Sequence, residues 1–171
     1  MSVRAAVLLF LCLLVAPLAA ARDLLQLDRL SDTVPPFDLA PAVVGDGTLD
    51  LAALAGRTVL LHFWATWCGP CRDELPALQG LADHLDAARF AVVLVAIDET
   101  ATGDEVARYA RELGVTLPVY LARESTVSDR YWQWGVPVSY VIDRRGGFVG
   151  RALGPRAWAE PAVADALRGL E

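Results

Sequence analysis

The chain has 171 residues and a formal net charge of −6, from 21 acidic and 15 basic side chains. This length fits one domain with a short N-terminal extension, and the acidic balance argues against a nucleic acid as the partner. The hydrophobic content of 55% is inflated by an apolar N-terminal segment, so it does not by itself indicate a membrane protein.

Residues 1–21 are predicted to be an export signal. Arg4 makes the N-terminus positive, Ala5–Val15 is apolar, and Ala19–Ala21 offers a cleavage site of small residues. The apolar run is short for a transmembrane helix, which needs about 20 apolar residues. The alternative is an uncleaved N-terminal anchor. Both interpretations place the remaining chain in a periplasmic or other extracytoplasmic compartment, and cleavage would remove Cys12.

Residues 22–33 are expected to form a linker, and residues 34–171 a single domain. The segment Val34–Leu39 contains two prolines and then a short edge strand. Gly45–Gly47 is a turn signal, so an N-terminal β-hairpin is expected. Leu49–Ala55 is expected to form a short helical turn.

A buried strand at Val59–Trp64 leads into the central motif of the sequence. Its residues are apolar or aromatic except for His62, as expected for a strand that is covered on both faces. Apolar residues at helical spacing predict an amphipathic helix over Cys71–Ala87. Pro76 lies inside this helix and should kink it.

The later segments alternate between apolar runs and helical patterns. Strands are predicted at Phe90–Asp98, Leu117–Ala122, Val136–Asp143 and Phe148–Arg151, and helices at Thr102–Leu113, Thr126–Trp134 and Pro155–Leu170, the last with a break at Pro161. This order predicts an α/β fold with a mixed central β-sheet and helices on both faces.

The motif Cys68-Gly69-Pro70-Cys71 lies at the predicted strand-to-helix junction. The positive end of the helix dipole favours a thiolate there. Two intervening residues allow the sulfurs to form a disulfide, and Gly69 and Pro70 should fix a tight turn that leaves Cys68 at the surface. Cys68 is therefore the predicted nucleophile and Cys71 the resolving thiol. A purely structural disulfide is the alternative, but so short a loop stabilises little.

The run Trp64–Cys71, followed by Glu74 and Pro76, resembles the active-site segment of thioredoxin-like proteins. More narrowly, it is similar to exported thiol–disulfide oxidoreductases of the TlpA/ResA type, from about Val34 to the C-terminus. The resemblance implies a thioredoxin fold and a redox-active Cys68–Cys71 disulfide without another cofactor or a metal. It also implies a protein disulfide as substrate, such as apocytochrome c or a copper-site protein, and a membrane-embedded thiol electron donor. We expect a monomer.

The resemblance extends to Pro137 and Glu74. In similar proteins a cis-proline lies against the cysteine pair, and a cis bond here would expose the Val136 backbone to an extended substrate. The alternative is a trans-proline that opens an edge strand. A glutamate at the position of Glu74 is implicated in proton handling by the cysteines. The alternative is an acid in the first helical turn that complements the dipole.

His62 departs from the family pattern, because thioredoxins carry an aspartate at this position and TlpA-like proteins often an asparagine. Strand alternation places His62 on the same face as Trp64, near the cysteine pair. It could accept a proton from Cys71, but we favour a core histidine that is satisfied by backbone hydrogen bonds. Trp67 is expected to present a flat surface to the substrate, and Trp64 to lie in the core.

Two other classes of function use the same residues. A zinc or copper carrier could bind metal through the two cysteines, although His62 and His84 lack the spacing that would complete a four-ligand site. A non-catalytic binding module on a thioredoxin scaffold would not need to keep both cysteines.

Overall fold

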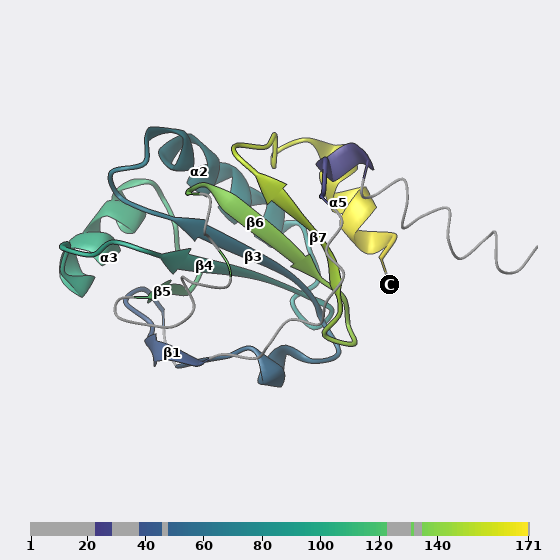
Figure 1. Ribbon diagram of the computed structural model, residues 1–171, viewed down its shortest axis with the longest axis horizontal. Helices are drawn as coiled ribbons and strands as arrows, with labels where there is room; N and C mark the ends of the chain where they lie inside the picture. Colours follow the sequence, from purple (N-terminus) through teal and green to yellow (C-terminus); the bar gives the residue numbers. More distant parts are fainter. Residues whose placement is uncertain (1–22, 29–37, 46–47, 123–130, 132–134, 171) are drawn as a thin grey trace, which may run out of the picture.

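The computed structural model describes residues 23–28, 38–45, 48–122, 131 and 135–170 (Figure 1). The predicted export signal, the two prolines before the first strand, and most of the predicted helix at 126–134, with Trp132 and Trp134, lie outside the described residues. Within the described part of the chain, no helix has the length and apolar character needed to cross a bilayer.

A five-stranded sheet forms the centre of the domain, in the order β5-β4-β3-β6-β7. The strands are β3 (Thr58–Trp64), β4 (Phe90–Ala96), β5 (Val119–Leu121), β6 (Val138–Ile142) and β7 (Phe148–Leu153). Strands β3, β4 and β5 run parallel, whereas β6 is antiparallel to β3 and β7 is antiparallel to β6. The predicted mixed sheet is confirmed.

The central strand β3 separates two apolar clusters. Leu60 and Trp64 point to the face that is covered by α2 (Gly69–Asp83), α3 (Gly103–Glu112) and α5 (Pro161–Arg168). Leu61 and Phe63 point to the opposite face. In Figure 1, α2 lies on one side of the sheet and β1 on the other. All seven residues of β3 are buried because side chains cover both faces.

The opposite face is packed by the segment that precedes β3 and by Tyr131. Strand β1 (Asp38–Pro41) pairs antiparallel with β2 (Thr48–Asp50), and η1 (Ala52–Leu54) follows. Residues 46 and 47 of the turn predicted between the strands lie outside the described residues. The helical turn is shorter than predicted, because the first residues of the predicted turn belong to β2.

The helices α2 and α5 differ most from their predicted bounds. Helix α2 begins at Gly69, since Cys68 serves as its N-cap, and it ends at Asp83 with His84 as C-cap. Helix α5 begins at Pro161 rather than at Pro155. The predicted break at Pro161 is therefore wrong. Proline at the first helical position loses no hydrogen bond, because that N–H has no partner inside the helix.

The start of α3 is fixed by a capping box. The Oγ1 of Thr102 accepts a hydrogen bond from the Glu105 backbone N–H at 3.3 Å, and the Glu105 carboxylate accepts one from the Thr102 N–H at 2.7 Å. We expect Thr102→Ala to lower the free energy of unfolding by about 1 kcal/mol. Thr102→Ser keeps the hydroxyl and should keep most of the stability. Urea unfolding checks this, and equal losses in the two variants would contradict it.

Candidate active site

Cys68 and Cys71 form a disulfide with their Cα atoms 5.3 Å apart. Cys68 is the N-cap of α2 and has an extended backbone (φ −87°, ψ 103°), which leads the chain from the strand side into the helix. The Cys71 backbone N–H donates to the Cys68 Sγ at 3.2 Å. The Cys68 sulfur therefore lies at the positive end of the helix dipole, where a thiolate is stabilised.

The predicted geometry of the motif is wrong in two respects. Gly69 and Pro70 are the first two residues of α2 and do not form a separate turn. Cys68 is also buried in the disulfide form, with only 4% of its surface exposed, and Cys71 is completely buried. The reason is that the helix begins directly after Cys68, so the Cys68 sulfur lies against the first helical turn.

Trp67 provides the large exposed surface next to the disulfide. Its side chain is 67% exposed and lines a polar cleft together with Thr66, Asp98 and Tyr109. The buried Asp98 carboxylate accepts hydrogen bonds from the N–H and the hydroxyl of Thr66, two residues before Cys68. Trp64, in contrast, is fully buried and stacks on Tyr109, which agrees with its predicted place in the core.

The peptide bond between Val136 and Pro137 is cis, as expected. Val138, the next residue, pairs with Phe63 of β3. The start of β6 therefore lies beside the end of β3 from which the chain continues to Cys68. The Pro137 carbonyl accepts a hydrogen bond from Gly154 at 3.0 Å, and Val136 is partly buried. Pro137 and the cysteines thus lie at the same end of the central strands β3 and β6.

Glu74 is buried on α2, one turn beyond Cys71. Its Oε1 accepts hydrogen bonds from the Arg156 backbone N–H at 2.7 Å and from the Trp158 indole N–H at 2.5 Å. Its Oε2 is buried without a hydrogen-bond partner. Burial raises the pKa of Glu74 to about 7, against hydrogen bonds that lower it.

Glu74 is therefore not the exposed first-turn acid of the alternative interpretation. It is the sixth residue of α2, and the first turn of that helix contains no acidic side chain. Trp158 is 1% exposed and holds the Glu74 carboxylate, a role that was not predicted. No local sequence signal connects these two residues, because 84 positions separate them.

His62 is fully buried on the same face of β3 as Trp64. Its Nδ1 lies 2.8 Å from the hydroxyl of Ser139, the residue opposite it on β6. Its Nε2 is buried without a partner. Burial lowers the pKa of His62 to about 3, so the ring is neutral near pH 7. The partner is a serine hydroxyl and not the expected backbone group.

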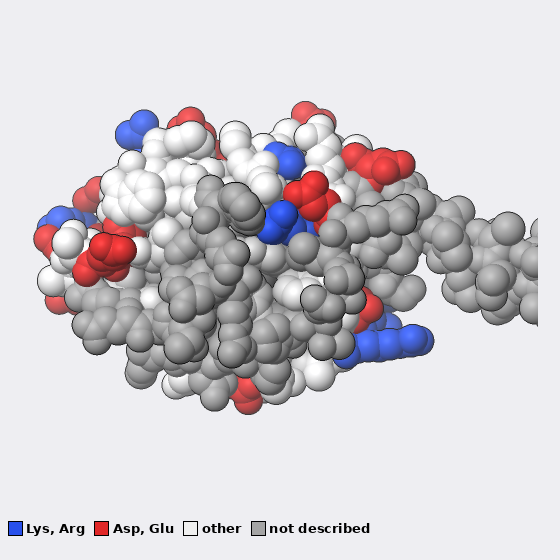
Figure 2. All heavy atoms as spheres, in the orientation of Figure 1, with Lys and Arg blue, Asp and Glu red and all other residues white. Residues whose placement is uncertain are grey.

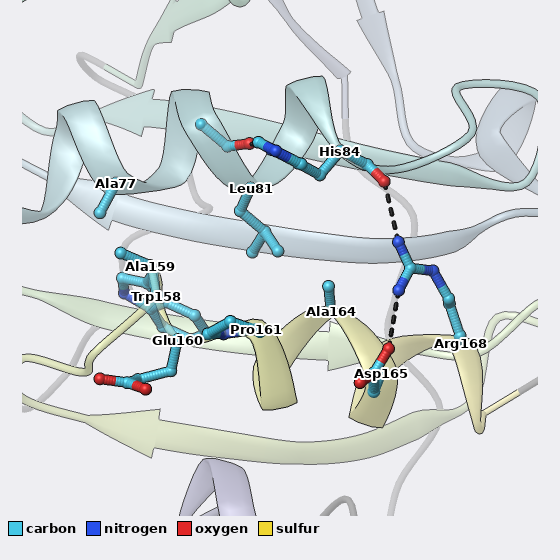
Figure 3. A pocket seen from close by; sticks show the side chains of 11 residues that line it. Ala77, Leu81, His84, Trp158, Ala159, Glu160, Pro161, Ala164, Asp165 and Arg168 are labelled. Atoms are coloured by element: carbon cyan, nitrogen blue, oxygen red, sulfur yellow. Dashed lines mark hydrogen bonds and ion pairs between the residues drawn. The ribbon is translucent and has the colours of Figure 1, made fainter.

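A groove of about 300 Å³ lies between α2 and α5 (Figure 3), and neither cysteine is among the residues that line it. At one end Arg168 joins the two helices, since its guanidinium donates to the His84 carbonyl and to Asp165.

On the face shown in Figure 2, acidic and basic side chains are interspersed. Within the described residues, no three His, Cys, Asp or Glu side chains gather as a metal site would require.

The AhpC/TSA family profile matches residues 30–149. The chain belongs to the AhpC/TSA family. The thiol-disulfide oxidoreductase ResA of Oceanobacillus iheyensis is 33% identical over 120 residues, which are 69% of this chain and 62% of that protein. The thioredoxin-like protein YneN of Bacillus subtilis is 35% identical over 92 residues, 53% of each chain. The matched regions thus span less than two thirds of these relatives.

Solved structures resemble almost the whole domain. A thiol:disulfide interchange protein of the thioredoxin family from Chlorobium tepidum has a TM-score of 0.67 and 28% identity, covering 82% of this chain and 99% of that one. A second structure from the same organism, assigned as DsbE, has a TM-score of 0.71 and 29% identity, covering 85% and 99%. The thioredoxin-like fold and the resemblance to the ResA type are confirmed.

The raised pKa of Glu74 gives stability a pH dependence. Between the ordinary value of 4.5 and about 7, the folded protein keeps a proton on Glu74 that the unfolded chain has released. The Glu74 contribution to the free energy of unfolding therefore falls as the pH rises through this window. In Glu74→Gln this contribution is absent, so the variant should gain stability relative to the wild type from pH 4.5 to 7.

Urea unfolding at several pH values checks this expectation. Glu112→Gln is the matched control, because the Glu112 side chain is 67% exposed on α3. Its difference from the wild type should change far less with pH. A difference between Glu74→Gln and the wild type that stays constant across the window would contradict the assignment.

Proposed function

We propose that this protein is an extracytoplasmic thiol–disulfide oxidoreductase that reduces protein disulfides through Cys68 and Cys71. The observation that carries the proposal is the Cys68–Cys71 disulfide at the N-terminus of α2, where the dipole and the Cys71 N–H favour a Cys68 thiolate. The similarity to ResA and to thiol:disulfide interchange proteins supports the same activity.

In the reduced protein, the Cys68 thiolate attacks a sulfur of the substrate disulfide. A bond forms between the Cys68 Sγ and that sulfur, and the second substrate sulfur leaves as a thiolate that takes up a proton. The Cys71 thiolate then attacks the Cys68 Sγ and releases the first substrate sulfur. Two electrons have passed to the substrate, and the protein is left with the Cys68–Cys71 disulfide.

Glu74 is the better candidate for proton exchange with Cys71. It lies one turn along the helix, and its pKa of about 7 lets it both accept and donate a proton near neutral pH. The pKa of His62, about 3, makes that ring a weak proton acceptor, and Ser139 engages its Nδ1. We therefore assign His62 to the core.

The substrate would bind over the end of the central strands where the disulfide lies. Trp67 offers an exposed aromatic face beside Cys68. The backbone at Val136 lies two residues before β6, where an extended segment of the substrate could pair with it as an added strand. Gly69 and Pro70, at the exposed start of α2, would border the same surface.

We infer protein disulfide substrates such as apocytochrome c or a copper-site protein, and a membrane-embedded thiol protein that reduces the Cys68–Cys71 disulfide after each turnover. The support is the similarity to ResA and the predicted export signal. A disulfide-reducing activity is useful in an oxidising compartment, where protein thiols otherwise become oxidised.

Single cysteine variants test the mechanism. Cys68→Ser should abolish the reduction of insulin disulfides, because no nucleophile remains. Cys71→Ser should react with an activated aromatic disulfide and retain the mixed disulfide, since no second thiol resolves it. Mass spectrometry detects that adduct. Insulin reduction that survives Cys68→Ser would contradict the proposal. One equivalent of tightly bound metal without any insulin reduction would favour the metal carrier instead.

The direction of electron flow is tested by the midpoint potential of the Cys68–Cys71 couple. A protein that reduces others should have a potential below about −230 mV, and a strong oxidant would lie near about −120 mV. Equilibration with dithiothreitol or glutathione, followed by alkylation of the free thiols, measures the potential. A value near that of the oxidants would contradict the reducing role.

A further inference from the structure

We propose that Arg156 and the N-terminal strap (residues 23–28) position the Glu74 carboxylate one turn from Cys71, with Arg156 as the positioning residue. This inference rests on the proposed function, because it concerns the proton-exchanging group of that site. It assigns a role to two parts of the chain that lie outside the cysteine motif.

The first observation is how the strap is attached. Asp28 and Arg151 of β7 exchange two backbone hydrogen bonds, at 2.7 and 3.1 Å, and their side chains pair at 3.3 Å. Leu25 and Leu27 are buried in the same apolar cluster as Cys71. The strap therefore extends the sheet by one bridge and shares a core with the active site.

The second observation is the set of contacts made by the Arg156 guanidinium. Its Nε donates to the Leu25 carbonyl at 3.2 Å, and its Nη2 to the Gln26 carbonyl at 3.3 Å. Its Nη1 donates to the carbonyl of Leu153, the last residue of β7, and to those of Gly154 and Pro155 in the loop that follows. The planar fork of an arginine can serve both segments at once. Arg156 thus ties the strap to this loop.

The third observation is that the same loop holds Glu74. The Arg156 backbone N–H and the Trp158 indole donate to Oε1 of Glu74, as described above. Arg156 therefore binds the strap with its side chain and Glu74 with its backbone. If the strap or the guanidinium fork is lost, the loop loses its support and water gains access to the carboxylate.

Among the described residues, few charged groups act on the pKa of Glu74. The guanidinium of Arg156 lowers the pKa of Glu74 through its charge. On α2, Arg72 and Asp73 lie 4.0 Å apart and are exposed. On the strands, His62 is neutral and Arg151 pairs with Asp28. The raised pKa of Glu74 therefore depends on the exclusion of water, which the strap and the loop supply.

Gly150 offers a way to disturb the strap without touching Arg156 or Glu74. A Cβ at this position would lie 2.7 Å from both the Asp28 carbonyl oxygen and the Leu27 Cβ, closer than such atoms can approach. Gly150→Ala should therefore displace the strap. Arg156→Lys keeps the positive charge but loses the planar fork, so this variant tests the fork while the net charge stays the same.

The experiment is a titration of the Glu74 carboxyl by ¹³C NMR in the oxidised protein, with the signal assigned by its loss in Glu74→Gln. The expected pKa of the wild type is about 7. In Arg156→Lys and in Gly150→Ala it should fall by about one unit or more towards the ordinary range, because water reaches the carboxylate. Burial is the largest cause of the raised pKa, so its loss outweighs the loss of the hydrogen bonds that lower the pKa. Arg168→Lys, a matched change on α5, should leave it unchanged.

Each outcome decides the proposal. An unchanged or raised Glu74 pKa in Arg156→Lys would overturn it, even if the variant were less stable. If Gly150→Ala fails to fold, the Arg156→Lys titration alone decides. A wild-type pKa near 4.5 would also overturn it. Because the titration needs no substrate, a protein that shows these shifts but reduces no disulfide would refute the proposed function and keep the positioning role.

Discussion

The capping of α2 by Cys68 is the contact on which the site depends. A buried strand ends at Trp64, and a four-residue connection delivers Cys68 to the first turn of the helix in an extended conformation. The sulfur then lies against that turn, and the Cys71 N–H donates a hydrogen bond to it. The strand is fixed by side chains on both faces and the helix by its apolar stripe, so neither can move without exposing core.

Around this contact, burial acts on two ionisable side chains in opposite directions. Removal of water disfavours the charged form of any group, so it raises the pKa of the acid Glu74 and lowers that of the base His62. The result is that Glu74 titrates near neutral pH, whereas His62 stays neutral over the whole physiological range. One physical cause thus separates a group suited to proton exchange from one suited to the core.

Much of this arrangement could be predicted from the sequence because its signals are local. The apolar run before the motif and the helical spacing after it predict the junction that carries both cysteines, and the order of elements predicts the mixed sheet. The predicted helix boundaries were wrong where one residue type can either end a helix or begin one. Pro161 was interpreted as a helix break because proline removes a hydrogen bond, yet it opens α5, where no bond is lost.

The contacts that the sequence could not reveal are those between distant segments. Trp158 and Arg156 reach Glu74 across more than eighty positions, and Ser139 reaches His62 across 77. None of these pairs has a periodic or spaced signature, since each depends on which segments become neighbours in the fold. The exposure of Cys68 was mispredicted for a related reason. The sequence predicted a helix that starts at Cys71, and only the backbone shows that Gly69 is already helical.

The same distant contacts explain how a carboxylate can be kept so near the cysteines without disrupting the core. A buried carboxyl group needs hydrogen-bond donors, and α2 has none to spare at the second turn, where its own N–H groups bond within the helix. The donors must come from another segment. The loop after β7 supplies a backbone N–H and an indole, and it can do so only while it is itself held against the sheet. The Glu74 carboxyl group at the active site thereby depends on a segment near the C-terminus of the chain.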